Sequence, residues 1–333
     1  YLLKGHEDLR LDERIMQFFR LINSLLRKKS SLYSNFIQTI CVIPLSLGHG
    51  LVQWVSEAAT LRQIVEDYRI LHGINPLIEY DLANAISESN YDHLKSIQKM
   101  QILEWIFNDI PDTDIGNSFW LKAANAEAWL KRTSTFAIST AINSIVGYII
   151  GLGDRHPSNL LIDNKTGKTI HIDFGDCFEK AMHRKILPEV VPFRLTRMMV
   201  KAFGASGADG LFRSSFIEMS SLLRENSRVL ILVLAVFVHE PLIDPEELEP
   251  NAELMQWASA SGIQAEKMII PKELVMNVAS STEIRKRVGQ KLSGNDIEKG
   301  KSLSVEDQAT ILIDKATSIY SMSQMYSGWC PFW

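Results

Sequence analysis

The first 55 residues show strand-like and helix-like apolar patterns in turn. Residues 1–4, 36–43 and 51–55 have the short apolar runs of strands, and a turn containing two glycines is predicted at 47–50. Between the first two strands, residues 8–28 are predicted to form a helix, because apolar side chains recur at helical spacing at Leu11, Ile15, Phe18, Ile22 and Leu25. These patterns predict a small unit in which strands pack against one long helix.

Helical spacing dominates after this unit. Thr60 and Gln63 form a capping box in front of an apolar helix face made of Leu61, Ile64, Val65 and Tyr68. Residues 73–133 are predicted to be mostly helical, with loops near 109–116. Further helices are predicted over residues 193–203, 215–238 and 271–292.

The last third of the chain contains one segment of different character. Residues 239–270 are acidic and rich in proline, which predicts a mobile insert between helices. Ser304 and Asp307 then cap a final helix, with an apolar face made of Val305, Ala309, Leu312 and Ala316.

A helix and a hairpin are predicted in the middle of the chain. Residues 136–153 carry no charged side chain, which favours a buried helix that runs into a loop. Residues 159–162 and 169–173 have strand patterns, and the turn residues at 163–168 predict that they form a hairpin. Pairing these strands would bring Asn159 and Asp173 close together at one end. His171 is interpreted as a buried hydrogen-bonding strand residue, and the glycosylation-type triplet at 164–166 as part of the turn.

Composition limits the class of protein. The chain has 333 residues, of which 46% are apolar and 22% charged, so it is long enough for a two-lobed catalytic unit with a large core. The net charge of −4 argues against nucleic acid as a main partner. Three widely spaced cysteines predict a reducing compartment and no zinc site. No signal peptide or membrane span is predicted, and a chain that begins with a strand at Tyr1 indicates a fragment of a longer protein.

The residues around the predicted hairpin indicate phosphoryl transfer. Residues 151–159 read Gly-Leu-Gly-Asp-Arg-His-Pro-Ser-Asn, and Asp-Phe-Gly follows at 173–175. Transfer from a nucleotide needs a carboxylate for the attacking hydroxyl, a polar group for developing charge and oxygen ligands for Mg²⁺. Asp154 would supply the carboxylate for the hydroxyl, and His156 the polar group for the developing charge. Asn159 and Asp173 would bind the metal. Which of Asp154 and His156 is the base stays open.

Two other segments could form a nucleotide pocket. Lys4 lies at a strand end before a helix that carries Glu7 and Asp12, where it could neutralise phosphates. An ordinary solvated ion pair is the alternative. Residues 52–55 lie between the two predicted lobes, and Trp54 could stack on a base or simply be buried at the junction.

These motifs together resemble a known family. Protein kinases place the histidine before the aspartate of the catalytic loop, whereas here it follows, as in the phosphatidylinositol-3-kinase-related kinases. Lys4-Gly-His-Glu-Asp-Leu-Arg, Pro192-Phe-Arg-Leu-Thr-Arg-Met and the final Gly-Trp-Cys-Pro-Phe-Trp resemble the target-of-rapamycin (TOR) branch and its FATC tail. The resemblance runs nearly end to end and is weakest at 73–133 and 239–300.

The resemblance implies an α+β, two-lobed, protein-kinase-like fold of the PI3/PI4-kinase type. Its N-lobe would be incomplete, and its helical C-lobe would carry a helical FATC extension. The implied units are a partial N-lobe and hinge (1–55), a C-lobe (56–240) with its catalytic loop (151–159) and activation segment (173–196), the mobile insert (239–270), C-terminal kinase helices (271–302) and the FATC tail (303–333).

The family also implies a function and a set of site residues. It implies a serine/threonine protein kinase that controls growth and uses ATP with Mg²⁺ or Mn²⁺. Lys4 would contact phosphates with support from Glu7 and Asp12, while Asp154, His156, Asn159 and Asp173 would act as above. The adenine pocket would be lined by Leu2, Gln53, Trp54, Val55, Thr60, Leu161 and Ile172.

Partners and location follow from the same resemblance. The helical insertion at about 73–110 would bind a WD-repeat β-propeller subunit, or alternatively just pack on the C-lobe. Protein substrates and the scaffold subunits of a larger TOR-type complex are the other expected partners. The expected location is cytoplasmic and peripheral on endomembranes such as the lysosome or vacuole, with the tail as a membrane contact. For Trp329, Phe332 and Trp333, however, packing on the kinase core is preferred to insertion into a membrane.

The sequence also departs from the family. The family's glycine-rich loop and its FKBP–rapamycin-binding region have no counterpart in this sequence and would lie upstream of it. Gln53 stands where many relatives have glycine, and Ser323 where many have cysteine, so Cys330 is predicted to form no disulfide within the tail.

Two rival functions fit part of the pattern. A phosphoinositide lipid kinase would explain the basic residues Lys180, His183, Arg184 and Lys185, but Asp176, Glu179 and the tail argue against it. A pseudokinase scaffold would need a defect outside this sequence, because every polar catalytic group is present.

Overall fold

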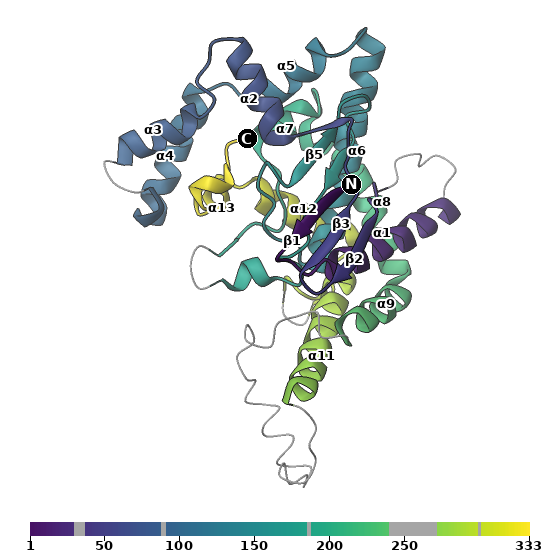
Figure 1. Ribbon diagram of the computed structural model, residues 1–333. Helices are drawn as coiled ribbons and strands as arrows, with labels where there is room; N and C mark the ends of the chain where they lie inside the picture. Colours follow the sequence, from purple (N-terminus) through teal and green to yellow (C-terminus); the bar gives the residue numbers. More distant parts are fainter. Residues whose placement is uncertain (30–36, 88–90, 185–187, 240–271, 299–300) are drawn as a thin grey trace.

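Two small antiparallel sheets lie among helices at the centre of the molecule (Figure 1). The computed structural model describes residues 1–29, 37–87, 91–184, 188–239, 272–298 and 301–333. The insert predicted at 239–270 therefore lies outside the described residues, apart from its first residue. So do Phe36 and Lys185.

The first sheet and one long helix form the small lobe. Its strand order is β1 (Leu2–Gly5), β3 (His49–Val52) and β2 (Val42–Ser46), and α1 (Arg10–Lys29) packs against β2. The predicted helix is confirmed, and its apolar face is buried at Leu11, Ile15, Phe18 and Ile22.

The strand predicted at 36–43 is wrong except at its last two residues, Val42 and Ile43. Residues 37–41 have no regular structure, and β2 begins only at Val42. Ile37 and Ile40 are buried, but the Asn23 side chain of α1 accepts a hydrogen bond from the Ile37 N–H (2.9 Å) and donates one to its carbonyl (2.8 Å). The apolar run is thus a coil bonded to a helix. The strand predicted at 51–55 also differs, because β3 begins at His49 and ends at Val52.

The second sheet joins the catalytic hairpin to the start of the helical lobe. β4 (Ala58–Thr60), β5 (Leu160–Asp163) and β6 (Thr169–His171) are hydrogen-bonded in that order. The predicted hairpin is confirmed, whereas β4 was not predicted. Thr60 ends β4 and also caps α2 (Leu61–Leu71), accepting a hydrogen bond from the Gln63 N–H at 3.0 Å.

The helical lobe is built around α6 (Ala126–Ile150). From Phe136 onward almost every side chain of α6 is buried, although the helix is long and apolar enough to cross a membrane. It packs against α8 (Leu211–Glu225) and α5 (Asp114–Leu121), with further helices α7 (Arg197–Ala202), α9 (Ser227–His239), α11 (Lys272–Ser293), α12 (Val305–Thr317) and α13 (Ile319–Ser323). Short 3-10 turns occur at Lys180–His183, Gly207–Asp209 and Ser327–Trp329.

Two helix predictions are corrected in this lobe. The helix predicted at 193–203 is shorter, since α7 begins only at Arg197. The helix predicted at 215–238 is two helices, because Asn226 ends α8 and its side chain donates to the Leu222 carbonyl at 2.8 Å. The helix predicted at 271–292 and the helix capped by Ser304 are confirmed, but the latter is not the last, because the short α13 follows it.

The helical insertion predicted at about 73–110 projects from the helical lobe at the end opposite α11 (Figure 1). It contains α3 (Ile78–Ser87), a 3-10 turn (Tyr91–His93) and α4 (Ser96–Asp109). Ala83, Tyr91, Ile106 and Ile110 form a small hydrophobic cluster here that is separate from the main core.

Candidate active site

The catalytic loop begins where α6 ends at Gly151. This residue adopts φ +61°, and a side chain there would lie 2.6 Å from the Glu179 nitrogen. At Gly153, an added Cβ would lie 2.3 Å from the Ala181 Cβ. Both glycines therefore let the catalytic loop pass close to the segment that follows Asp-Phe-Gly, and the Gly153 N–H donates to the Asp176 carbonyl at 2.8 Å.

Asp154 is held from both sides in a left-handed conformation with φ +57°. Its N–H donates to Glu189 Oε1 at 2.6 Å, and its carbonyl accepts from Asn159 Nδ2 at 2.9 Å. Two of the predicted site residues, Asp154 and Asn159, are thus in direct contact.

Arg155 joins the loop to the Asp-Phe-Gly segment. Its buried guanidinium donates to the carbonyls of Gly153 (2.9 Å) and Ile172 (2.8 Å) and to that of Asp173. The Ile172 N–H donates to the Asn159 carbonyl at 3.2 Å. The structure therefore brings Asn159 and Asp173 to the same end of the hairpin.

His156 is placed as a neutral hydrogen-bonding group. Burial lowers its pKa, while the carboxylate of Asp154 acts in the opposite direction. The Ser158 N–H donates to His156 Nδ1 at 3.2 Å. A neutral imidazole that accepts at Nδ1 carries its proton on Nε2, so in this arrangement His156 can donate from Nε2.

Carboxylates gather around Asp173 and Lys4. Lys4 Nζ contacts Glu7 Oε2 at 2.9 Å, as the sequence predicted. Burial acts to lower the pKa of Lys4, but the bond to Glu7 and the charges of Asp173 and Asp12 outweigh it and leave that pKa raised. Asp12 is buried, accepts a hydrogen bond from the Phe174 N–H at 3.4 Å, and has its pKa raised to about 6, first by burial and then by the charge of Asp173.

This cluster fits a divalent cation. The charge of Asp173 raises the pKa of the buried Asp12 carboxyl, which shows that negative charge accumulates here. A bound cation would offset this repulsion. The side chains of Asn159 and Asp173 offer oxygen atoms, the donor type that Mg²⁺ prefers, and this ion commonly takes its remaining ligands from phosphates and water. The described part of the chain has no group of three or more His, Cys, Asp or Glu side chains suited to a metal, so phosphates would have to complete the set.

The predicted adenine-pocket residues lie at two places. Thr60 and Leu161 face each other across β4 and β5, next to the strand that leads to Ile172. Leu2 pairs with Val52 across β1 and β3, immediately before the hinge residues 53–55.

The hinge itself is only partly as expected. The Gln53 side chain accepts from the Cys41 N–H at 2.9 Å, and the Gln53 N–H donates to the Cys41 carbonyl at 2.8 Å. Trp54 is 66% exposed, so the alternative of a tryptophan buried at the lobe junction is wrong. Val55 packs against the core.

The C-terminal tail is connected to the catalytic loop through Arg194. Trp329, Phe332 and Trp333 are all buried, which confirms core packing over membrane insertion. Arg194 donates to the carbonyls of Trp329 (2.7 Å), Cys330 (2.5 Å) and Trp333 (3.0 Å), and also to that of Arg155 (3.1 Å). Burial lowers the pKa of Arg194 to about 9.

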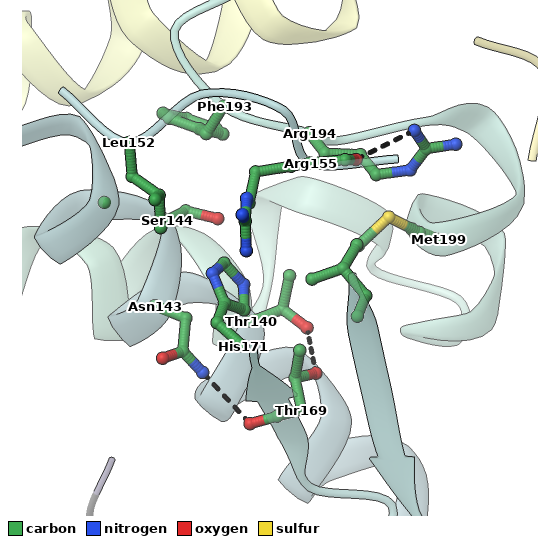
Figure 2. Close-up of a pocket in the computed structure, with 12 residues that line it drawn as sticks. Thr140, Asn143, Ser144, Leu152, Arg155, Thr169, His171, Phe193, Arg194 and Met199 are labelled. Carbon is green, nitrogen blue, oxygen red and sulfur yellow. Dashed lines mark hydrogen bonds between the residues drawn. The ribbon is translucent and has the colours of Figure 1, made fainter. Parts of the chain in front are cut away.

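A small cavity lies between these two arginines and β6. Figure 2 shows Arg155 and Arg194 side by side, with the His171 ring below Arg155 and with Thr140 and Thr169 joined by a hydrogen bond of 2.9 Å. The cavity has about 10 Å³, which is room for about one water and not for a nucleotide. His171 is half-buried rather than fully buried, and the desolvation of its ring holds its pKa well below the usual value.

Sequence reasoning missed three residues of this region. Arg155, Glu189 and Arg194 stand inside or beside the quoted motifs, yet no role was predicted for them. A charged residue among apolar neighbours, as in Pro192-Phe-Arg-Leu, is the signal that could have identified a buried arginine.

A small sheet lobe, a helical lobe and a catalytic loop facing an Asp-Phe-Gly segment define a kinase-like fold. The family model for phosphatidylinositol 3- and 4-kinase matches residues 1–246, and that for the FATC domain matches residues 302–333. The chain therefore belongs to the phosphatidylinositol 3- and 4-kinase family, in the branch that carries a FATC domain.

Similar proteins agree with this placement. The chain is 39% identical to the serine/threonine-protein kinase mTor of Drosophila melanogaster and to the serine/threonine-protein kinase TOR2 of Saccharomyces cerevisiae, over 100% of its own length. It spans only 15% and 14% of those relatives. A solved structure of the FAT and kinase domain of CtTel1 matches with a TM-score of 0.80 and 25% identity, over 100% of this chain and 22% of that one.

Proposed function

We propose that this chain is the catalytic region of a TOR-like serine/threonine protein kinase, which transfers the γ-phosphoryl group of ATP to protein hydroxyls. The observation that carries the proposal is the convergence of Asp154, Asn159 and Asp173. Asn159 bonds the Asp154 carbonyl, and Arg155 links the loop to the Asp-Phe-Gly segment through backbone carbonyls. The names of the similar proteins support a protein substrate.

The residues divide the work as follows. Asn159 and Asp173 would hold Mg²⁺, or Mn²⁺, which supplies charge neutralisation at the phosphates when bound. Lys4, kept in place by Glu7, would bind phosphate oxygens. Leu2, Gln53, Trp54, Val55, Thr60, Leu161 and Ile172 are proposed to surround the adenine.

Asp154 is the better candidate for the proton acceptor. The Nδ1 atom of His156 already accepts a hydrogen bond, so the neutral ring presents a donor at Nε2. A donor can stabilise the transferring phosphoryl group but cannot take the proton of the substrate hydroxyl. Asp154 is half-buried, and its carboxylate can accept that proton.

The test is transfer of label from ATP to a serine/threonine peptide and to phosphatidylinositol, in parallel. The intact protein should label the peptide, and Asp173→Ala should lower the rate at least 1,000-fold with no loss of fold, because it removes a metal ligand. Asp314→Ala, which changes an exposed aspartate of α12, should behave as the wild type.

Each other result has a distinct meaning. Labelling of the lipid alone would favour a lipid kinase. Mg-ATP binding without any transfer would favour a pseudokinase. Full activity of Asp173→Ala would contradict the metal assignment.

The insertion at about 73–110 is proposed to bind a WD-repeat subunit of a larger complex near endomembranes. Its separate small core and its exposed Ile97 (62%) and Trp105 (47%) support a docking role. Co-purification of the intact protein with WD-repeat subunits should weaken in the double variant Ile97→Ser and Trp105→Ser. Unchanged recovery would contradict this surface.

A further inference from the structure

The backbone of Asp154 needs support to keep its conformation. A non-glycine residue with φ +57° is strained by roughly 1–2 kcal/mol, because Cβ comes close to the following carbonyl oxygen. The side chain of Asp154 leaves the backbone in a direction that this conformation sets. Whatever holds the two adjoining peptide groups therefore sets where the carboxylate points.

Asn159 holds only one of those peptide groups. Its amide donates to the Asp154 carbonyl at 2.9 Å, and this contact lies within the catalytic loop. The other side of Asp154 is held from outside the loop, since its N–H donates to Glu189 Oε1 at 2.6 Å.

Glu189 is built to make this contact. Its own N–H donates to the Ala181 carbonyl at 3.0 Å, which fixes it to the activation segment. Ala181 in turn packs where Gly153 has no side chain. Burial raises the pKa of Glu189, the bond to the Asp154 N–H opposes this, and Asp154, Arg184 and Arg155 are the charged groups nearby.

We propose that Glu189 is a positioning residue for phosphoryl transfer, which holds the Asp154 backbone so that its carboxylate faces the substrate hydroxyl. The inference rests on the proposed function of Asp154 as the proton acceptor. Because Glu189 belongs to the activation segment, the orientation of Asp154 depends on that segment being in place. The activation segment thereby supplies one of the two supports that hold Asp154 in the catalytic loop.

The test compares two substitutions of similar length. Glu189→Gln keeps an oxygen that accepts from the Asp154 N–H, whereas Glu189→Met removes the acceptor and keeps the bulk. In the intact protein, Glu189→Met should lower kcat for peptide phosphorylation at least tenfold with KM for ATP unchanged. Glu189→Gln should stay within threefold of the wild type. The same pair of changes at exposed Glu283 in α11 is the control.

A second measurement does not depend on activity. Amide hydrogen exchange in the peptide that spans residues 153–158 should speed up in Glu189→Met and stay near wild type in Glu189→Gln. A wild-type rate and exchange pattern in Glu189→Met would overturn the inference, as would equal losses in both variants. If the wild-type protein itself transfers no phosphate, the proposed function fails, and the exchange result still decides whether Glu189 holds the loop.

Discussion

At the scale of single residues, Asp12 makes the small lobe sensitive to pH. Its pKa is about 6 in the folded chain against an ordinary value of 3.8. Between these values the folded protein binds a proton that the unfolded chain does not bind. The free energy of unfolding should therefore fall as pH rises through this window, and the full cost of the buried charge is present above pH 6.

Asp12→Asn tests this linkage. The variant should be more stable than the wild type by about 1–3 kcal/mol at pH 7–8 and equally stable near pH 4, because it carries no charge to desolvate. Denaturant unfolding of both proteins from pH 4 to pH 8 measures the difference. A difference that does not change with pH would contradict the assignment, and Asp314→Asn serves as the exposed control.

Individual residues also mark how far sequence could predict the site. The proximity of Asp154, Asn159 and Asp173 could be predicted, because it depends on short spacings along the chain and on one hairpin. Glu189 and Arg194 could not, since they contact residues 35 and 135 positions away, and only the fold brings those atoms together. Arg155 lies inside the motif, but its bonds go to backbone carbonyls, which no sequence pattern specifies.

At the scale of elements, apolar runs identified burial more reliably than structure type. Ile37 and Ile40 before β2 are buried as expected for an apolar run, yet the side chain of Asn23 bonds the Ile37 backbone in place of a neighbouring strand. The tail was assigned correctly to the core, because three large aromatic side chains gain more from burial there than from exposure to water.

The tail is fastened to the insertion as well as to the catalytic loop. Trp333 Nε1 donates to Glu79 Oε2 of α3 at 3.2 Å, and Glu79 also pairs with buried Arg69 at 2.5 Å. The Tyr91 hydroxyl donates to the Ser323 carbonyl at 3.2 Å. Polar contacts therefore join the tail to the insertion at two separate places.

Trp333→Phe should weaken this junction. The change keeps most of the packing but removes one hydrogen bond to a charged group, so the free energy of unfolding should fall by about 1–3 kcal/mol. Thermal or denaturant unfolding measures the loss. Trp120→Phe, at a tryptophan that is 53% exposed, should change stability by less than about 0.5 kcal/mol, and an equal loss there would contradict the argument.

At the scale of the whole molecule, ion pairs connect α11 to Glu179 in the segment that follows Asp-Phe-Gly. Buried Lys291 contacts Glu179 Oε1 at 2.6 Å and donates to the Tyr148 carbonyl at 2.8 Å, and Arg287 reaches Glu179 at 3.0 Å. Burial acts to raise the pKa of Glu179, but the charge of Lys291 and the bond from Arg287 outweigh it and lower that pKa. Ion pairs thus join α11 to the segment that follows Asp-Phe-Gly, although the paired residues are more than 100 positions apart in the sequence.

A double-mutant cycle measures this joint. Lys291→Met alone should cost about 3–5 kcal/mol, because it leaves Glu179 short of a buried partner, and combining it with Glu179→Gln should recover more than 1 kcal/mol of that loss. The exposed pair of Lys29 and Glu225 is the control, with an expected coupling below about 1 kcal/mol. Equal coupling in the two cycles would show that burial does not strengthen the pair.

The separate hydrophobic cluster of the insertion has a consequence for how this protein can evolve. Ala83, Tyr91, Ile106 and Ile110 pack on one another and not on the main core. Substitutions on the outer faces of α3 and α4 can therefore accumulate without disturbing the residues of the candidate active site. Lineages would be free to remodel this module for new assemblies, and a protein engineer could graft a foreign recognition face onto it while leaving the chemistry intact.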